Sequence, residues 1–399
     1  MRDLTARPIR LRHPSPFPSA FHHLQVAMPA APGVDAQAVV VDLADEVDLR
    51  LVDRAVRRHW WSADHGVLRP RRATARDLAA EGDPVLTPRS LGWVDPAERA
   101  APGFPLASDS DDVPRLWVRA YRDGAGGPRE GWMPYTAAVA RHIDARPDEP
   151  LAHPPLLGGF GAGADSASAS REAWRAIVAD DALWCWWTGL VPAASLELDP
   201  GVALLWADAD LALTLRRLER GTLAPATLAA VDDGDVLVVG GACGDDAAAQ
   251  RAAIARALWQ LVMARALDDP ARTVTGPGVV AHRADRRYAP DTAEDRRRLL
   301  DPLAHVQLAL DPRVRAMLRR RLEIESPDDA AAGRPPLAVE TWTAPLAPDG
   351  GVVRMHVPQA VPLPLGAFRL DPALVDAAAQ RRGIAPTDAA LVQVPYPGW

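Results

Sequence analysis

The sequence contains no lysine and no asparagine among its 399 residues. Without lysine the chain has neither a Schiff-base nucleophile nor the lysine of a phosphate-binding P-loop, so both chemistries are excluded for the chain acting alone. Only two cysteines are present, Cys185 and Cys243, and each lies beside small or apolar residues. This speaks against a disulfide framework and against a cysteine zinc cluster, and we expect both cysteines to be buried.

Long apolar runs are also missing. No stretch approaches the roughly eighteen apolar residues of a membrane-spanning helix, and the N-terminus lacks the apolar core of a signal peptide, which predicts a cytoplasmic protein without a membrane partner. The net charge is −7 and arginines alternate with acids, so there is no basic field to attract nucleic acid. Hydrophobic residues make up 48% and charged residues 24%, as in a globular protein of one large or two medium domains.

The most informative stretch is residues 158–189, GGFGAGADSASASREAWRAIVADDALWCWWTG. A glycine-rich turn leads into three alternate serines, Ser166, Ser168 and Ser170, each able to cap a helix. No glycine or proline interrupts residues 171–187, and apolar residues recur there at steps of three and four. Periodicity alone predicts a core helix behind a flexible turn.

Further elements follow from the same rules. We expect strands at residues 36–43, 115–122, 202–207, 235–239, 338–346 and 352–357, and helices at residues 47–59 and 211–220. Asp245 and Asp246 should start a long alanine-rich helix. Residues 87–112 read as an irregular connection with one short strand, and the group His59, Trp60, Trp61 and His65 as a packed aromatic turn rather than a metal site.

The run AWRAIVADDALWCWWTG resembles the helix that YcaO-family proteins carry after a glycine-rich turn, in the form of the azoline-forming members. In that family two glutamates of this helix hold the magnesium ions of bound ATP. The resemblance places these two glutamates on Ala176 and Ala179, and a family arginine on Asp180. The apolar residues and the tryptophan pair of the family motif are kept, while the two metal-binding glutamates are replaced.

A second block resembles the family helix whose Glu and Gln face the nucleotide. It is ALWQLVMAR at residues 257–265, with Gln260 for the Glu, Met263 for the Gln, and Arg265 kept. A third block, VVRMHVPQAVPLPLGAFRL, matches a C-terminal family run at Arg354 and at the prolines and glycine that follow. The family ends in a proline-alternating tail implicated in catalysis, of which Pro395 and Pro397 remain.

The resemblance implies an α/β fold of mixed sheets flanked by helices, with the two long helices lining a central cleft. It divides the chain into an N-terminal lead-in with a small α/β subdomain, residues 1–90, and a YcaO-like domain, residues 91–399. Azoline-forming members use ATP and Mg²⁺ to cyclise Cys, Ser or Thr in a precursor peptide. They act with a leader-peptide-binding partner and sometimes with a flavin dehydrogenase, and we expect an oligomer, which could include a second YcaO protein.

Three hypotheses remain open. Magnesium takes oxygen ligands, so alanine and methionine at the aligned positions favour a degenerate subunit that scaffolds azoline formation. Glu172 and Asp180 lie one helical turn on either side of Ala176, and a shifted carboxylate set could instead support an active ATP-dependent cyclodehydratase. The third is a precursor-binding module without nucleotide chemistry. Arg265 and Arg354 are the surviving groups that could meet a phosphate or a peptide carbonyl.

Overall fold

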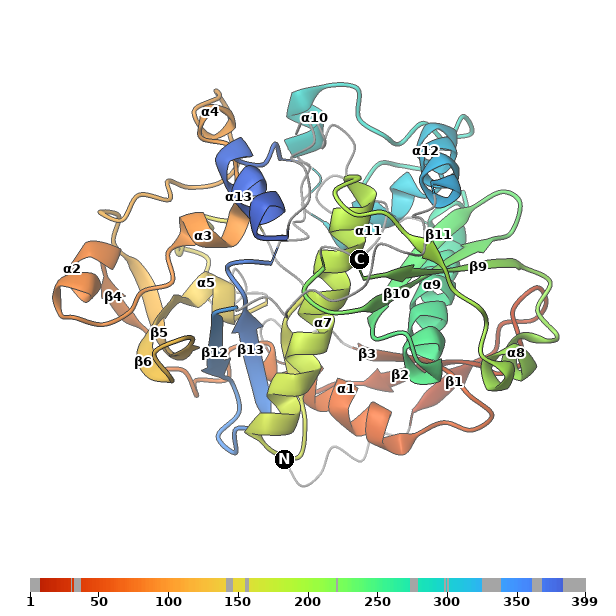
Figure 1. Ribbon diagram of the computed structural model, residues 1–399, viewed down its shortest axis with the longest axis horizontal. Coiled ribbons are helices and arrows are strands. Elements are labelled where there is room, and N and C mark those ends of the chain that lie inside the picture. Colours follow the sequence, from red (N-terminus) through yellow and green to blue (C-terminus); the bar gives the residue numbers. More distant parts are fainter. Residues whose placement is uncertain are drawn as a thin grey trace.

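The computed structural model describes residues 8–29, 31, 37–140, 146–154, 158–219, 222–272, 279–297, 299, 301–324, 339–360 and 368–382. Within these residues the strands form three antiparallel sheets, seen at the bottom, left and right of Figure 1. Mixed sheets flanked by helices were expected, and this arrangement is confirmed. No helix of the described residues combines the length and the apolarity needed to cross a membrane.

The smallest sheet is built by the N-terminal residues. Its strands are β1 (Ile9–Leu11), β2 (Phe21–Ala27) and β3 (Gln37–Leu43), and helix α1 (Leu49–Trp61) packs on it after an Asp48 cap. The predicted strand at 36–43 and helix at 47–59 are therefore confirmed. His65 stacks on Trp60 with ring centroids 4.1 Å apart, which confirms the packed aromatic turn.

Histidines join this small sheet to the rest of the molecule. Nε2 of His13 and Nδ1 of His23 are 2.9 Å apart, so one nitrogen donates a hydrogen bond to the other. The buried His23 ring packs edge-on against Trp259, with centroids 4.7 Å apart. Burial first, and then the neighbouring His13, lowers the pKa of His23 to about 4, so the ring is neutral in the folded protein near pH 7.

A six-stranded sheet is completed by the C-terminal third of the chain. The order is β4-β5-β12-β13-β7, with β6 paired to β5, so the β12–β13 hairpin lies between β5 and β7. The strand bounds are β4 (Arg71–Ala73), β5 (Arg115–Asp123), β6 (Arg129–Pro134), β7 (Phe160–Ala162), β12 (Thr341–Pro345) and β13 (Val352–His356). Strands were predicted over β5, β12 and β13. The domain boundary at residue 90 stays a prediction, and β4 before it pairs with β5 after it.

Short helices surround this sheet. They are α2 (Ala75–Ala80), α3 (Pro88–Gly92), α4 (Pro96–Arg99) and α5 (Tyr135–Ala138). The interpretation of residues 87–112 as irregular chain with a short strand was wrong, since α3 and α4 form there. Each begins with a proline in the first helical position, and the Asp95 side chain caps α4 through the Ala97 N–H at 2.8 Å.

The third sheet has the order β11-β10-β9-β8, with bounds β8 (Ala194–Ser195), β9 (Ala212–Leu218), β10 (Ala226–Asp232) and β11 (Leu237–Cys243). Two predictions were wrong here. Residues 202–207 belong to helix α8 (Pro200–Trp206), because Asp199 caps its first turn and Pro200 starts it. Residues 211–220 contain strand β9 instead of a helix, because β9 pairs along its whole length with β10, and tertiary pairing overrides local propensity.

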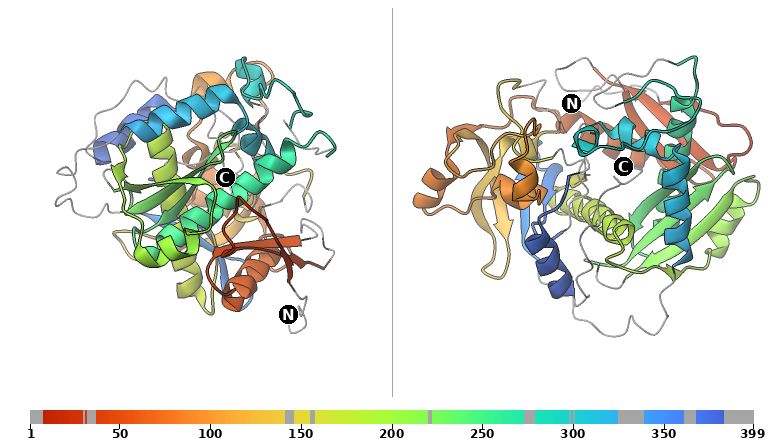
Figure 2. Two further views of the ribbon diagram at one scale, coloured as in Figure 1. Left: turned by 90° about the vertical axis from the view of Figure 1, so that its right-hand side faces the viewer. Right: turned by 90° about the horizontal axis from the view of Figure 1, so that it is seen from above.

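Two long helices were predicted correctly. Helix α7 (Ser166–Trp187) is capped by Asp165 with Ser168 in a reciprocal capping box, and α9 (Ala247–Leu267) is capped by Asp246. Figure 2 shows α7 between the second and third sheets in its right-hand view. The early residues of α7 pack on β7 and β13, and its last turns pack on β10 and β11.

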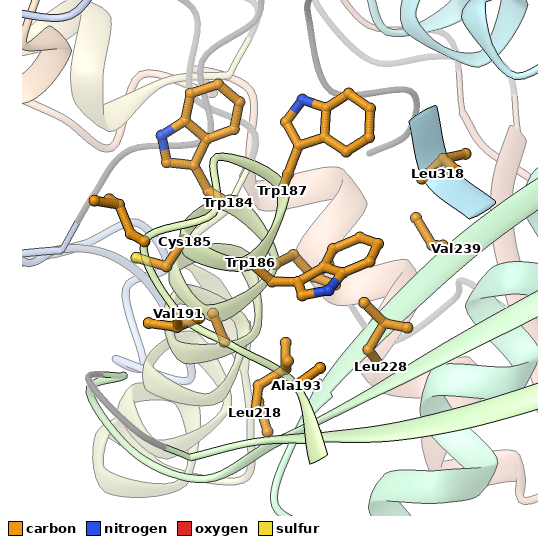
Figure 3. Close-up of a cluster of buried hydrophobic side chains, with 14 of the residues drawn as sticks. Trp184, Cys185, Trp186, Trp187, Val191, Ala193, Leu218, Leu228, Val239 and Leu318 are labelled. Carbon is orange, nitrogen blue, oxygen red and sulfur yellow. The ribbon is translucent and has the colours of Figure 1, made fainter. Parts of the chain in front are cut away.

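The last turns of α7 carry a large buried cluster. Trp184, Trp186 and Trp187 belong to this cluster together with Leu228 and other apolar residues of the third sheet, and Figure 3 shows the Trp186 ring directed toward Leu228. Helices α11 (Pro302–Leu308) and α12 (Pro312–Glu323) contribute to the same cluster, and α13 (Pro372–Arg382) reaches it with Val375 and Ala378. The short helix α10 (Ala293–Arg297) precedes α11. Helix α9 packs on the opposite face of the third sheet.

Candidate functional site

The two long helices approach each other at strand β11, which forms an edge of the third sheet. A Cβ at Gly240 would lie 2.4 Å from the Ala253 carbonyl oxygen of α9, and a Cβ at Gly241 would lie 2.6 Å from Cδ1 of Leu183 of α7. The two glycines thus let one helix sit tightly on each face of the strand. The helices flank β11 from opposite sides, so the expected cleft lined face to face by α7 and α9 is not how they are arranged.

The aligned positions of α7 carry little chemistry. Ala176 is partly exposed, but Ala179 is fully buried, so a longer side chain at 179 would have to displace neighbouring residues. Neither alanine offers a donor atom to a cation. The two nearby carboxylates, Glu172 and Asp180, are therefore the groups on α7 that could serve as ligands.

Glu172 is already engaged. Its Oε1 lies 3.1 Å from Nη1 of Arg58 on α1, and its Oε2 accepts a hydrogen bond from the Ala162 N–H of β7 at 3.4 Å. These contacts connect α7 to α1 and to the second sheet. Metal binding by Glu172 would have to break an ion pair and a backbone hydrogen bond.

Asp180 lies at the glycine-rich turn and is partly exposed. Its Oδ2 is so close to Gly158 that any Cβ at that position would collide with it. Loss of solvation raises the pKa of Asp180 to about 6, although the positive charges of Arg256 and Arg354 act against this rise. Asp180 is thus a carboxylate that changes charge just below neutral pH, between arginines from two separate elements.

Arg354 faces the other side of this turn and is almost fully buried, with 1% of its surface exposed. Its Nε donates to the Ala137 carbonyl oxygen at 3.0 Å, its Nη1 donates to the Gly158 carbonyl oxygen, and its guanidinium lies 4.1 Å from the centre of the Phe160 ring. Burial lowers its pKa to about 9, and the negative charge of Asp180 opposes that effect. These contacts hold Arg354 against backbone carbonyls of its own chain.

His356 completes this buried group. Its Nε2 lies 3.1 Å from Nε of Arg354 and 3.0 Å from the Ala137 carbonyl oxygen. Burial, and next the charge of Arg354, holds the pKa of His356 well below its usual value. His305 likewise lies 3.0 Å from the Leu299 carbonyl oxygen. Both histidines are therefore held by contacts with the protein's own backbone.

The aligned positions of α9 are Gln260, Met263 and Arg265. Gln260 is buried, and Met263 packs against the core on the α9 face of the third sheet. Arg265 forms an ion pair with Asp233, with Nη2 2.8 Å from Oδ2, and its guanidinium lies 5.2 Å from the Phe17 ring centre. Arg265 therefore ties α9 to the β10–β11 turn, and sequence position alone could not reveal this partner.

Sequence reasoning overlooked Arg256 and Arg175. Arg256 of α9 reaches the edge of β11, where its Nη1 donates to the Gly241 carbonyl oxygen. Burial raises the pKa of the Cys243 thiol, and the charge of Arg175 on α7 and, to a smaller extent, that of Arg256 act to lower it. Cys243 is only partly buried, while Cys185 is buried as expected. Both arginines stand on helices that the resemblance had already singled out. Arg175 directly precedes Ala176 and Arg256 lies one turn before Gln260, and these positions were the signal that could have marked them.

The fold family implies Mg²⁺ and ATP, and the donor set does not fit the metal. Of the aligned positions, Ala176 and Ala179 have no donor atom and Met263 offers a soft sulfur, whereas Mg²⁺ requires oxygen. Glu172 is engaged with Arg58, and the Asp180 carboxylate lies against the turn with arginine charges on it. Among the described residues, no group of three or more His, Cys, Asp or Glu side chains is placed to hold a metal ion. Pro395 and Pro397 lie outside the described residues.

Comparisons with known proteins find similarity in the fold but none in the sequence. No family model matches the chain, and no curated protein matches it by sequence. Among solved structures, a heterocyclase in complex with substrate and cofactor aligns with a TM-score of 0.66 and 14% identity, covering 97% of this chain and 53% of that one. YcaO from Methanopyrus kandleri, bound with AMPPCP and Mg²⁺, aligns with a TM-score of 0.52 and 13% identity, covering 90% and 87%.

The E. coli microcin synthetase complex McbBCD aligns with a TM-score of 0.51 and 10% identity, covering 88% of this chain and 87% of that one. The chain spans about half the length of the first heterocyclase and of the heterocyclase TruD, of which it covers 53% and 48%. At these identities the likeness concerns the fold. The chain has the fold of the YcaO-type heterocyclases, which confirms the resemblance drawn from the three sequence blocks.

Proposed function

We propose that this chain is a YcaO-type subunit of a machinery that forms azoline rings in a ribosomally made peptide, and that it supports the reaction without binding Mg·ATP itself. The proposal rests on helix α7, where the two positions aligned with the metal-binding glutamates are Ala176 and the fully buried Ala179. Phosphoryl transfer depends on a positioned Mg²⁺ that neutralises charge at the phosphates, and alanine at these two positions offers the ion no ligand.

Partners are part of this proposal. The microcin synthetase structures are complexes, one of them with pro-MccB17 bound. By analogy, we expect a leader-binding protein and a precursor peptide to associate with this chain, together with a second YcaO protein or a flavin dehydrogenase. A subunit with this fold and without a metal shell would contribute binding surface and position the peptide for an active partner.

Thermal unfolding with nucleotide tests the absence of Mg·ATP binding. A ligand at one hundred times its dissociation constant adds about 2.7 kcal/mol to the folded state, which is easily seen as a shift in melting temperature. The chain is measured alone, with millimolar Mg²⁺, with ATP and chelator, and with both together. We expect Mg²⁺ to add nothing to the effect of ATP. A shift that requires both would contradict the proposal.

The alternative of an active cyclodehydratase has one observation in its favour, which is Asp180. With a pKa near 6 it is mostly ionised at pH 7.5, and it is partly exposed beside the glycine-rich turn. If this alternative holds, Asp180→Asn should abolish a Mg²⁺-dependent shift. Asp112→Asn, which changes an exposed carboxylate paired with Arg76, serves as the matched control and should leave the shift intact.

A third measurement separates a subunit from an independent peptide-binding module. Candidate precursor peptide is immobilised and incubated with the chain alone and with its partner proteins. A subunit is retained only when the partners are present, and the modified peptide then loses one water per ring. Retention of the chain alone would favour the module that binds peptide without nucleotide chemistry.

A further inference from the structure

A cavity lies outside the α7, β11 and β13 region. It is open to solvent on one side, is lined by residues of α3, of α4 and of the chain that follows α4 up to Asp109, and has a volume of about 430 Å³. Figure 1 shows α3 and α4 at the upper left beside α13, and the Asp371 N–H donates to the Trp93 carbonyl oxygen at 2.6 Å between these elements. Pockets of roughly 300 to 1,000 Å³ accommodate small organic ligands.

The walls of this cavity carry a net positive charge. Arg89 and Arg99 line it together with a single acid, Asp109. The Arg99 side chain is only 12% exposed and is fixed in place, because its Nη1 donates to the Ala107 carbonyl oxygen at 3.1 Å and its Nη2 to the Ala152 carbonyl oxygen at 2.8 Å. Nε of Arg99 lies 3.1 Å from Oδ2 of Asp109, so the acid is engaged by Arg99.

Arg89 is the cation that can move toward a ligand. Its side chain is 65% exposed, and its Nη2 lies 3.7 Å from Oδ2 of Asp371, which is a long distance for an ion pair. Guanidinium groups bind carboxylates through two parallel hydrogen bonds, and such a bidentate pair is stronger than the contact with Asp371. An entering carboxylate would therefore compete well for Arg89.

The remaining surface of the cavity is apolar. Phe104, Leu106 and Pro96 line it, and the Arg99 guanidinium lies 5.7 Å from the Phe104 ring centre. Leu106 is buried, and Phe104 is partly exposed with its ring centroid 5.5 Å from that of Phe368. An aromatic or branched apolar group placed here would cover Phe104 and gain the free energy of removing that surface from water.

We propose that this cavity is a binding site for a small amphipathic carboxylate, with an apolar body against Phe104 and Leu106 and its carboxylate on Arg89. The ligand chemistry is that of an apolar group bearing a carboxylate, such as an acylated apolar amino acid, which could be free in solution or be the C-terminal residue of a peptide. This site is independent of the proposed function, because it shares no residue with the turn that holds Asp180 and Arg354.

Titration calorimetry on the full chain tests the proposal with two matched probes, N-acetyl-phenylalanine and its uncharged amide. The acid should bind with a millimolar dissociation constant and the amide at least tenfold more weakly. Arg89→Gln should reduce binding of the acid to the level of the amide. Arg76→Gln is the control, since Arg76 is 72% exposed and pairs with an acid elsewhere on the surface.

Ala100→Trp provides a second variant, because Ala100 lines the cavity and is exposed, so a large side chain can fill the space without disturbing the core. It should abolish binding of the acid. Each of three results would overturn the proposal. These are equal affinity for the acid and the amide, unchanged affinity for the acid in either variant, and no heat of binding with the acid at millimolar concentration. A tripeptide ending in phenylalanine separates the sources, since tighter binding than the free amino acid derivative identifies a peptide terminus.

Discussion

Gly240→Ala should destabilise the protein because it separates α9 from strand β11. The new methyl group would lie 2.4 Å from the Ala253 carbonyl oxygen and 2.5 Å from the Ala257 nitrogen, and both are backbone atoms in the middle of a long helix. A helix backbone cannot rotate away as a side chain can. The whole helix must shift by several tenths of an ångström, which disturbs the packing on that face of the sheet.

The magnitude follows from two opposing effects. Inserting a methyl group into a close-packed core costs about 1–3 kcal/mol, while replacing glycine stabilises by about 0.4–1 kcal/mol because it restricts the unfolded chain. We expect a net loss of about 1–2 kcal/mol. Gly241→Ala should cost less, because its methyl group meets the Leu183 side chain, which can change rotamer. Gly126→Ala meets no atom within 4 Å and should be neutral or slightly stabilising.

Urea unfolding followed by tryptophan fluorescence measures this series, since Trp186 lies in the buried cluster on the opposite face of the same strands. The order of midpoints should be Gly126→Ala highest, then Gly241→Ala, then Gly240→Ala. A Gly240→Ala midpoint equal to that of Gly126→Ala would refute the reasoning, because it would mean that α9 does not pack on β11 at the distance described.

Three further outcomes can be measured by unfolding experiments. Folding lowers the pKa of His23 from 6.5 to about 4, so the ring is neutral in the folded protein near pH 7. The free energy of unfolding is therefore highest above pH 6.5 and falls by about 3 kcal/mol as the pH drops to about 4. His23→Gln should reduce this pH dependence in urea titrations. Asp180 has a pKa raised from 3.8 to about 6, so its ionisation destabilises the fold as the pH rises through 6. Above pH 7 the Asp180→Asn variant should therefore be more stable than the native protein by about 1–3 kcal/mol, after allowance for the partial exposure of Asp180. The difference in stability should vanish near pH 4. A difference that persists at pH 4 would contradict the raised pKa of Asp180. Trp186→Ala should cost about 3–5 kcal/mol in calorimetry because Trp186 is 2% exposed, whereas the partly exposed Trp174→Ala should cost less.

The sequence predicted the elements whose signals are local. Helices α7 and α9 carry their own caps and uninterrupted apolar periodicity, and strand β3 carries a valine run. Residues 211–220 were misassigned because the leucines and arginines there are good helix formers, whereas their pairing partners on β10 lie outside any local window. Pro200 at the start of α8 was a usable signal that the apolar run after it concealed.

The site was harder to predict because its contacts join distant parts of the chain. Glu172 meets Arg58 across 114 positions, and Arg354 meets Gly158 across 196. The alignment of motifs correctly marked the helices and the turn, but it could not tell that Glu172 is engaged with Arg58 or that Arg354 binds backbone carbonyls. Arg256 and Arg175 went unnoticed because arginine is abundant in this chain, and only their position on the two aligned helices could have marked them.

The position of the β12–β13 hairpin has a consequence for synthesis on the ribosome. Strands β5 and β7 are complete long before their shared neighbours emerge, since Phe160 pairs with Arg354 nearly 200 residues later. During that interval both strands present unpaired backbone edges, the kind of surface that promotes aggregation in nascent chains. Truncated products ending before Thr341 should therefore depend on chaperones far more than the full-length polypeptide does.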